Sequence, residues 1–149
     1  MTGPTYQSPF GPISLRENGG VLTHLRWRHA DCPTSPLIEE ALAQIAAYFD
    51  GRLQVFDLPL DYGSGLQAKV RHAMAAIPFG ETRSYGELST ALGTPARDIG
   101  QACGANPLPI LIPCHRVLGR RTLGGFSAPG GVETKVALLR HEGAAGLLI

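Results

Sequence analysis

The residue in this sequence best placed to do chemistry is a cysteine between a proline and a histidine. Cys114 follows the apolar run 110–112 and Pro113, and His115 comes next. Because proline cannot continue a β-ladder, we expect a strand over 110–112 to end at Pro113 and to leave the sulfur at a rigid edge. A thiol beside an imidazole is a candidate nucleophile with a neighbouring base. The alternative is a small buried hydrophobic residue, the usual state of a free cysteine.

The composition is that of an ordinary globular protein. A chain of 149 residues, 44% of them hydrophobic, can bury one or two cores. No apolar run approaches the roughly 18 residues that span a bilayer, and the N-terminus lacks a secretory pattern, so we expect no membrane partner and a cytoplasmic location. Three cysteines without C-x-x-C spacing argue against a disulfide framework or a thiolate zinc site. We expect neither a metal nor a cofactor.

The net charge of +1 is unevenly distributed along the chain. Residues 1–60 hold four Lys and Arg against six Asp and Glu, which gives −2, whereas residues 61–149 hold nine against six, which gives +3. This weak basic excess permits a polyanionic partner, but a mixed, solvated surface explains it equally well.

The N-terminal half predicts a small sheet with one helix. Residues 4–29 alternate apolar and polar side chains around a turn at 18–20, which favours paired strands. We expect a further strand over 52–60.

The helix of this half is predicted from its ends. Ser35 and Pro36 are typical of an N-cap and a first helical residue, and apolar side chains then recur at helical spacing until Gly51. The glycine-containing stretch 62–65 is the best candidate for a linker. Nothing before it indicates chemistry.

The C-terminal half predicts short helices with explicit ends. One helix ends before Pro78, Ser84 and Glu87 fit a capping box that opens the next, and Gly93 ends that one. Two short helices joined by a tight glycine-containing turn form a helix-turn-helix. That arrangement alone is a weak indication of DNA binding.

The second helix of this pair has an unusual composition. We predict that Thr94 caps it, that Pro95 is its first residue and that it continues through 96–105. Each glycine in so short a helix costs about 1 kcal/mol, but small residues let another surface approach the backbone closely. That surface could be a protein core or a nucleic acid. Arg97 could project toward such a partner or form a surface ion pair.

Taken together, these motifs resemble the O6-alkylguanine-DNA alkyltransferase family, the methylated-DNA–protein-cysteine methyltransferases. The resemblance covers most of residues 66–143 and is most specific at the Pro–Cys–His–Arg–Val core. It rests on segments that occur in the family's order and near its spacing: Ile77–Thr82, Ser84–Gly86, Arg97–Gly100, Gly104–Pro107, Ile112–Val117 and Leu138–Gly143.

The resemblance implies an α/β protein in two parts. Residues 1–62 would form a small subdomain with a ribonuclease-H-like fold, which supports the other subdomain. Residues 63–149 would form a mainly helical subdomain with a winged helix-turn-helix-like motif, which binds DNA and carries out alkyl transfer.

The implied reaction moves an alkyl group from O6 of guanine in DNA to Cys114, once per molecule, because the thioether is not cleaved. The resemblance makes His115 the base that takes the thiol proton, and makes Glu142 and a water its orienting partners. A histidine titrates near working pH and a carboxylate fixes its tautomer, so the relay is chemically reasonable. Asn106 would hold the turn around the cysteine. Tyr85 would donate a hydrogen bond to the departing base.

The same likeness assigns residues to DNA and to the base pocket. Arg97 would fill the space of a flipped nucleotide, and the small residues near it, Thr94, Ala96 and Gly100, would let the helix lie in the minor groove. The base would be contacted by Pro109, Val117, Phe126 and Ser127, the last two from the glycine-rich segment 124–131.

The expected partner is double-stranded DNA that contains O6-alkylguanine, with O4-alkylthymine left open, and the protein is expected to act as a monomer. Asp98 departs from the family pattern and would weaken binding if it faced phosphates. One alternative is a non-catalytic protein that binds alkylated DNA and flags lesions for other repair. Another is a cysteine hydrolase or redox protein, in which Cys103 would have to reach Cys114.

Overall fold

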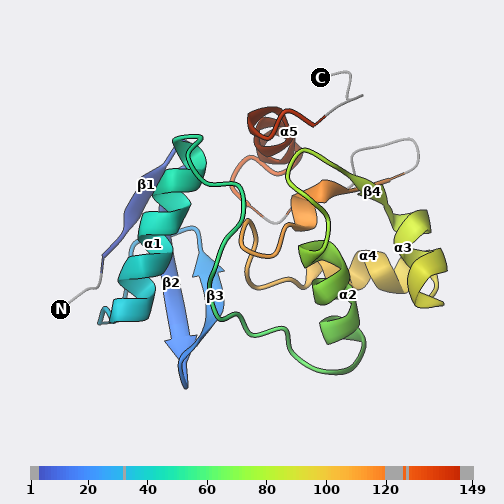
Figure 1. Ribbon diagram of the computed structural model, residues 1–149, viewed down its shortest axis with the longest axis horizontal. Helices are drawn as coiled ribbons and strands as arrows, with labels where there is room; N and C mark the ends of the chain where they lie inside the picture. The colour runs from blue at the N-terminus through green and yellow to red at the C-terminus, as the bar shows by residue number, and fades with distance from the viewer. Residues whose placement is uncertain (1–3, 32, 120–125, 127, 145–149) are drawn as a thin grey trace. The chain divides into compact units, whose positions relative to one another are not determined.

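The structure is a computed structural model that describes residues 4–31, 33–119, 126 and 128–144 (Figure 1). The chain forms two compact units, Met1–Asp61 and Tyr62–Ile149. Its mixed composition of helices and short strands confirms the predicted α/β class. Within the described ranges, no helix combines the length and the apolar character needed to cross a membrane.

The first unit is an antiparallel sheet with a helix packed on it. Strands β1 (Tyr6–Ser8), β2 (Gly11–Asn18) and β3 (Val21–Arg26) lie in the order β1-β2-β3, and α1 (Pro36–Phe49) contacts β1, β2 and β3. The predicted helix start is confirmed, since the Ser35 hydroxyl accepts from the Ile38 N–H at 3.2 Å. The core of this unit is apolar and includes Ile13, Leu15, Leu22, Leu25, Ile38, Leu42, Ile45 and Tyr48.

The strand predicted over 52–60 is wrong. This segment forms only an isolated bridge, in which the Leu22 N–H donates to the Pro59 carbonyl and the Asp61 N–H donates to the Leu22 carbonyl, both at 2.9 Å. A longer ladder is prevented because Pro59 has no N–H, and Val55 is 76% exposed, with no sheet face to cover it.

The second unit is mainly helical. Its helices are α2 (Gly65–Ala75), α3 (Tyr85–Leu92), α4 (Ala96–Gly104), the 3₁₀-helix η1 (Cys114–Arg116) and α5 (Val132–His141). Helices α3 and α4 pack against each other and against α2 (Figure 1). The unit's core includes Val70, Met74, Ile77, Leu88, Ile99, Ala102, Leu108, Ile112, Val117, Leu138 and Leu139.

The first helix of the helix-turn-helix begins and ends where the sequence predicts. The Ser84 hydroxyl accepts from the Glu87 N–H at 2.9 Å and the Glu87 carboxylate accepts from the Ser84 N–H at 3.0 Å, which completes the capping box. Gly93 closes α3 with a φ of 61°, in the left-handed region that glycine adopts without strain.

The start of α4 differs from the prediction by one residue. Pro95, not Thr94, is the N-cap: its extended backbone leaves its carbonyl to accept from the Asp98 and Ile99 N–H groups. The Thr94 hydroxyl donates to the Leu92 carbonyl at 3.2 Å, so it serves the end of α3 and not the start of α4.

A short parallel ladder pairs the residues just before Tyr85 with the residues just after the Cys114–Arg116 segment. Strand β4 (Arg83–Ser84) pairs with β5 (Val117–Leu118), with Arg83 opposite Val117 and Ser84 opposite Leu118. Because α3 begins directly after β4 and η1 ends directly before β5, this pairing places Tyr85 near the cysteine turn, the segment 106–114 that leads into η1. Residues 120–125 and 127 lie outside the described residues, and three of them, 124, 125 and 127, belong to the glycine-rich segment 124–131.

The strand predicted over 110–112 is also wrong. Ile110 has a φ of 72°, and the chain turns tightly there: the Leu111 N–H donates to the Pro109 carbonyl and the Ile112 N–H to the Leu108 carbonyl. The apolar run is buried as a strand would be, but its backbone groups bond within the turn, so no neighbouring strand is needed. Cys114 therefore opens a 3₁₀-helix and not a sheet edge.

Candidate active site

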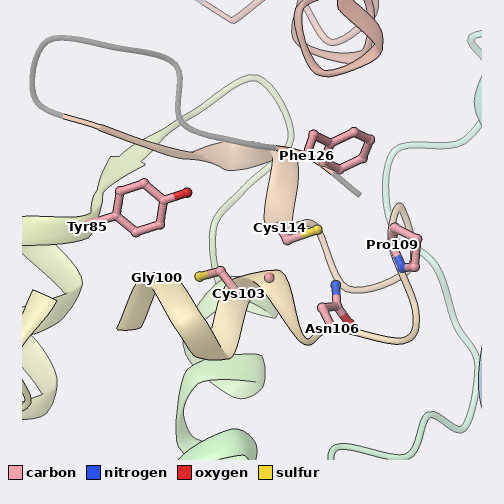
Figure 2. A pocket seen from close by; sticks show the side chains of 8 residues that line it. Tyr85, Gly100, Cys103, Asn106, Pro109, Cys114 and Phe126 are labelled. Atoms are coloured by element: carbon pink, nitrogen blue, oxygen red, sulfur yellow. The ribbon is translucent and has the colours of Figure 1, made fainter. Parts of the chain in front are cut away.

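A pocket of about 180 Å³ lies over the cysteine turn of the second unit. Figure 2 shows the Tyr85 hydroxyl and the Cys114 sulfur at this pocket, with α4 along one side. The pocket is lined by residues of α3, α4, the turn before Cys114 and η1, and by Phe126, which follows β5. The described lining residues are Tyr85, Gly100, Cys103, Gly104, Asn106, Pro109, Cys114 and Phe126.

Cys114 is a partly exposed residue held by local backbone geometry. Its N–H donates to the Ile112 carbonyl at 2.8 Å, and Pro113 fixes the preceding φ. Burial raises the pKa of the Cys114 thiol, while a hydrogen bond with the Asn106 side chain and the positive charge of Lys135 act to lower it. The thiol therefore needs a base and positive charge nearby to become a thiolate.

Asn106 ties the turn together from inside. Its amide nitrogen donates to the Ile112 carbonyl at 2.8 Å and its amide oxygen accepts from the Leu108 N–H at 3.0 Å, and the residue is buried. One side chain thus satisfies backbone groups on both arms of the turn that leads to Cys114.

Replacing Asn106 with alanine is expected to lower the free energy of unfolding by about 1–3 kcal/mol, because the buried Leu108 N–H loses its acceptor and the Ile112 carbonyl loses one of its two donors. Urea unfolding measures this change, and reaction of the Cys114 thiol should slow in the same variant because the sulfur is less well placed. Asn18→Ala, at an exposed position, is the matched control and should leave stability within about 0.5 kcal/mol. Equal midpoints for the two variants would contradict this role for Asn106.

Next to the cysteine, three buried ionisable side chains form one network. His115 Nε2 lies 2.7 Å from Glu142 Oε2. Arg116 donates from Nε to Glu142 Oε1 at 2.8 Å, from Nη2 to Glu142 Oε2 at 2.9 Å and from Nη1 to the Ile77 carbonyl at 2.7 Å. The carboxylate at the end of α5 is therefore fixed by a forked guanidinium as well as by the imidazole.

The charges in this network are well defined. Burial alone would raise the pKa of Glu142, but hydrogen bonds from His115 and Arg116 outweigh it and hold that pKa at about 2. Burial lowers the pKa of His115, although Glu142 acts to raise it. The neutral imidazole donates through Nε2 to the carboxylate, which leaves Nδ1 as an acceptor. This buried Nδ1 has no hydrogen-bond partner among the described residues, so it is free to accept a proton.

Tyr85 supplies a neutral donor on the opposite side of the pocket. Burial, and then the neighbouring Cys103 and Cys114 thiols, raise the pKa of its hydroxyl, which therefore stays protonated near neutral pH. A protonated phenol can donate to negative charge that develops on a bound base.

Helix α4 exposes one face and lines the pocket with another. Ile99, Ala102 and Cys103 face inward, whereas Ala96 and Arg97 are exposed. Asp98 is partly exposed beside them. No group of three or more His, Cys, Asp or Glu side chains within the described parts of the chain is placed to hold a metal ion.

Both units match models of one protein family. Residues 3–62 match the ribonuclease-like domain of 6-O-methylguanine DNA methyltransferase, and residues 65–144 match its DNA-binding domain. The chain belongs to this methyltransferase family. The methylated-DNA–protein-cysteine methyltransferase of Mycobacterium bovis is 43% identical over 150 residues, which cover 93% of this chain and 90% of the relative. The corresponding protein of Mycobacterium leprae is 41% identical, over 91% of this chain and 88% of the relative.

A solved structure of the family has the same fold. The crystal structure of Mycobacterium tuberculosis OGT in complex with DNA matches with a TM-score of 0.82 and 42% identity, over 94% of this chain and 91% of that one. The predicted family resemblance is thus confirmed, together with its two-part fold.

In this member of the methyltransferase family, most of the predicted site residues lie close together. Tyr85, Asn106, Pro109, Cys114 and Phe126 surround one pocket, joined by Gly100 from α4. His115 and Glu142 lie directly behind the cysteine turn in the buried network. The roles that the resemblance assigns to these residues remain predictions.

Two residues predicted to contact the base, Val117 and Ser127, are not found at the described pocket. Val117 is fully buried and is not among the described lining residues, because it begins β5 and its side chain belongs to the core. Ser127 lies outside the described residues.

Sequence reasoning considered Cys103 only as a resolving thiol and gave no role to Lys135, and both lie close to the pocket. Cys103 lines it from α4, and Lys135 lies behind it in α5 without any exposed surface. A cysteine inside a predicted helix and a lysine on a short amphipathic one are ordinary in sequence. Only the packing of α4 and α5 onto the cysteine turn distinguishes them.

Proposed function

We propose that this chain repairs DNA by transferring the alkyl group of O6-alkylguanine to the Sγ of its own Cys114. The observation that supports this most strongly is the pocket in which Cys114 and Tyr85 converge, with His115 and Glu142 buried directly behind. Its membership of the 6-O-methylguanine DNA methyltransferase family supports the same chemistry.

In the proposed reaction, His115 takes the thiol proton at Nδ1, directly or through a water. The thiolate attacks the alkyl carbon, a sulfur–carbon bond forms, and the bond between that carbon and O6 breaks with its electron pair left on the purine. Tyr85 donates a hydrogen bond to the negative charge that develops there. The purine then takes up one proton, so that the thiol and the alkylated base become a thioether and guanine.

The proposed partner is duplex DNA with the alkylated nucleotide extruded into the pocket. An enzyme that acts on a stacked base has to flip it out, at a cost of a few kcal/mol. Arg97 is exposed on α4, next to the pocket-lining Gly100, and we assign it to the space that the flipped nucleotide leaves. The proposal includes action as a monomer in the cytoplasm and reaction at O6 of guanine.

Two other functions are disfavoured. A non-catalytic lesion-binding protein has no use for a buried base and carboxylate behind a partly exposed cysteine. A redox protein would need Cys103 as a resolving thiol, but burial raises the pKa of Cys103 to about 12, which leaves it a poor thiolate at neutral pH.

The test is the intact mass of the protein after it is mixed with an excess of a duplex oligonucleotide that contains O6-methylguanine. We expect one methyl group per chain, mapped by peptide analysis to Cys114, and none with the unmodified duplex of the same sequence. Demethylation of several bases per chain without an adduct would overturn the proposal in favour of a hydrolase. Binding without any adduct would overturn it in favour of a lesion-binding protein.

A further inference from the structure

A serine of α3 binds both backbone polar groups of a threonine in the turn between α3 and α4 (Figure 1). The Ser89 hydroxyl donates to the Thr94 carbonyl, and the Thr94 N–H donates to the Ser89 carbonyl at 3.1 Å. The Gly93 N–H donates to the same Ser89 carbonyl, as is usual where a helix ends. The bond from the hydroxyl is an addition to this regular helix end, because it comes from a side chain and reaches past the cap.

The carbonyl that Ser89 holds belongs to the peptide group from which α4 starts. This group joins Thr94 to Pro95, the N-cap of α4, and it is planar. The proline ring restricts the next torsion, the φ of Pro95, which is −55°. Only the ψ of Pro95 then rotates freely between the held peptide group and Ala96, the first residue of the helix. A bond to the Thr94 carbonyl therefore constrains the direction in which α4 begins.

The first turn of α4 has few other contacts that fix its position. Pro95, Ala96 and Arg97 are exposed, and the buried side chains of the helix begin at Ile99. Within the part of the chain that the structure describes, the Arg97 guanidinium forms no ion pair. The position of the first turn is therefore set by the backbone that leads into it and by the packing that starts at Ile99.

The two halves of α4 have different tasks in the proposed function. Arg97, in the first turn, is assigned to the space that a flipped nucleotide leaves. Gly100 and Cys103, in the second half, line the pocket, and that half is held by the buried side chains of Ile99 and Ala102. A small rotation of the first turn would move the end of the long Arg97 side chain further than the backbone, and it would leave the pocket unchanged.

We propose that Ser89 is a positioning residue for DNA binding, whose hydroxyl fixes the Thr94 carbonyl and thereby the place at which Arg97 meets the duplex. The inference rests on the proposed function in that Arg97 contacts the alkylated DNA. A role in α3 alone does not explain the serine, because alanine is the better helix former. What serine adds at this position is the bond to the turn.

The first test measures the affinity for a duplex that contains O6-methylguanine, in a Cys114→Ser background so that the methyl group stays on the DNA. Ser89→Ala should weaken binding about fivefold, as expected for a residue that acts on a binding group indirectly. Thr90→Ala is the matched control and should keep the affinity, because its exposed hydroxyl donates to the Gly86 carbonyl within α3 at 3.1 Å. Equal affinities of the Ser89→Ala and Thr90→Ala proteins would overturn the proposal.

The second test determines whether Ser89 acts through Arg97. In a double-mutant cycle, independent residues give losses that add, whereas residues that act through one contact do not. We expect Ser89→Ala to weaken duplex binding about fivefold when Arg97 is present and less than about twofold in Arg97→Ala. Fully additive losses would overturn the proposal, because the serine would then act on DNA binding by another route.

The third measurement separates this inference from the proposed function. Reaction of the Cys114 thiol with iodoacetamide, mapped by peptide analysis, should have the same rate with serine or alanine at position 89, because the pocket-lining half of α4 keeps its packing. Losses of thiol reactivity and duplex affinity of the same size would overturn the proposal in favour of a general effect on the fold. If binding depends on Ser89 through Arg97 but the protein transfers no methyl group, the proposed function has failed while the role of Ser89 stands.

Discussion

Serine in place of Cys114 is expected to abolish methyl transfer, with a loss on the order of 10⁴-fold or more, as when other enzymes lose their nucleophile. A hydroxyl in this pocket has the same neighbours as the thiol, including the Asn106 side chain and Tyr85. It stays protonated at any pH at which the fold survives, and it is a far weaker nucleophile than a thiolate.

The measurement is the methylated fraction of each variant after incubation with O6-methylguanine duplex, read by intact mass, alongside the affinity for the same duplex. Affinity should change little, because serine is close in size to cysteine and the exposed face of α4 is untouched. Cys32→Ser removes another thiol of the sequence and serves as the control that keeps full transfer. Methyl transfer that persists in Cys114→Ser would contradict the assignment of the nucleophile.

Glu142→Gln is expected to lower both stability and rate. The carboxylate neutralises the buried Arg116 guanidinium through two hydrogen bonds and also orients His115. Loss of one partner from a buried ion pair costs about 3–5 kcal/mol, and loss of the orienting group from a general base costs about 10²–10⁴ in rate. Urea unfolding and single-turnover kinetics measure the two effects. Glu133→Gln, exposed in the first turn of the same helix, should leave both unchanged.

The same carboxylate gives a pH test of this prediction. The pKa of Glu142 is about 2 in the folded protein and about 4.3 for an unfolded glutamate, so the unfolded state binds more protons between these values. Its contribution to stability is complete above the unfolded pKa and is lost as pH falls toward 2. Glu142→Gln should therefore lose less stability than the unmodified protein when acidified from pH 5 to pH 3. Equal losses would show that Glu142 is not the group responsible.

Local signals in the sequence predicted the helices of the second unit well. The capping box at Ser84 and the glycine at 93 are formed by neighbouring residues, and the helix ends follow from them. The strand predicted over 110–112 failed for a nonlocal reason. Three buried apolar residues fit a strand or a turn equally well, and only the Asn106 side chain, together with a left-handed Ile110, decides for the turn.

Only part of the candidate site could be predicted, again because some of its contacts join residues that are far apart in the sequence. The Cys114–His115 pair stands out in sequence because its residues are adjacent, and the family resemblance supplied Glu142 from far along the chain. Arg116 as the second partner of Glu142, and Lys135 behind the pocket, follow only from packing between η1 and α5. A charged residue in a helix is normally predicted on the surface, so burial of Lys135 had no indication in its own segment.

The turn from Asn106 to Cys114 has a consequence for the motion of the nucleophile. It contains no regular secondary structure before η1, yet the amides of Leu108, Leu111, Ile112 and Cys114 all donate within it, and its apolar side chains are buried. Amide hydrogens in such a segment exchange with solvent when the core opens and not when a surface loop fluctuates. The loop that holds the Cys114 sulfur is therefore expected to open only as slowly as the core, so that the sulfur keeps one position relative to the pocket.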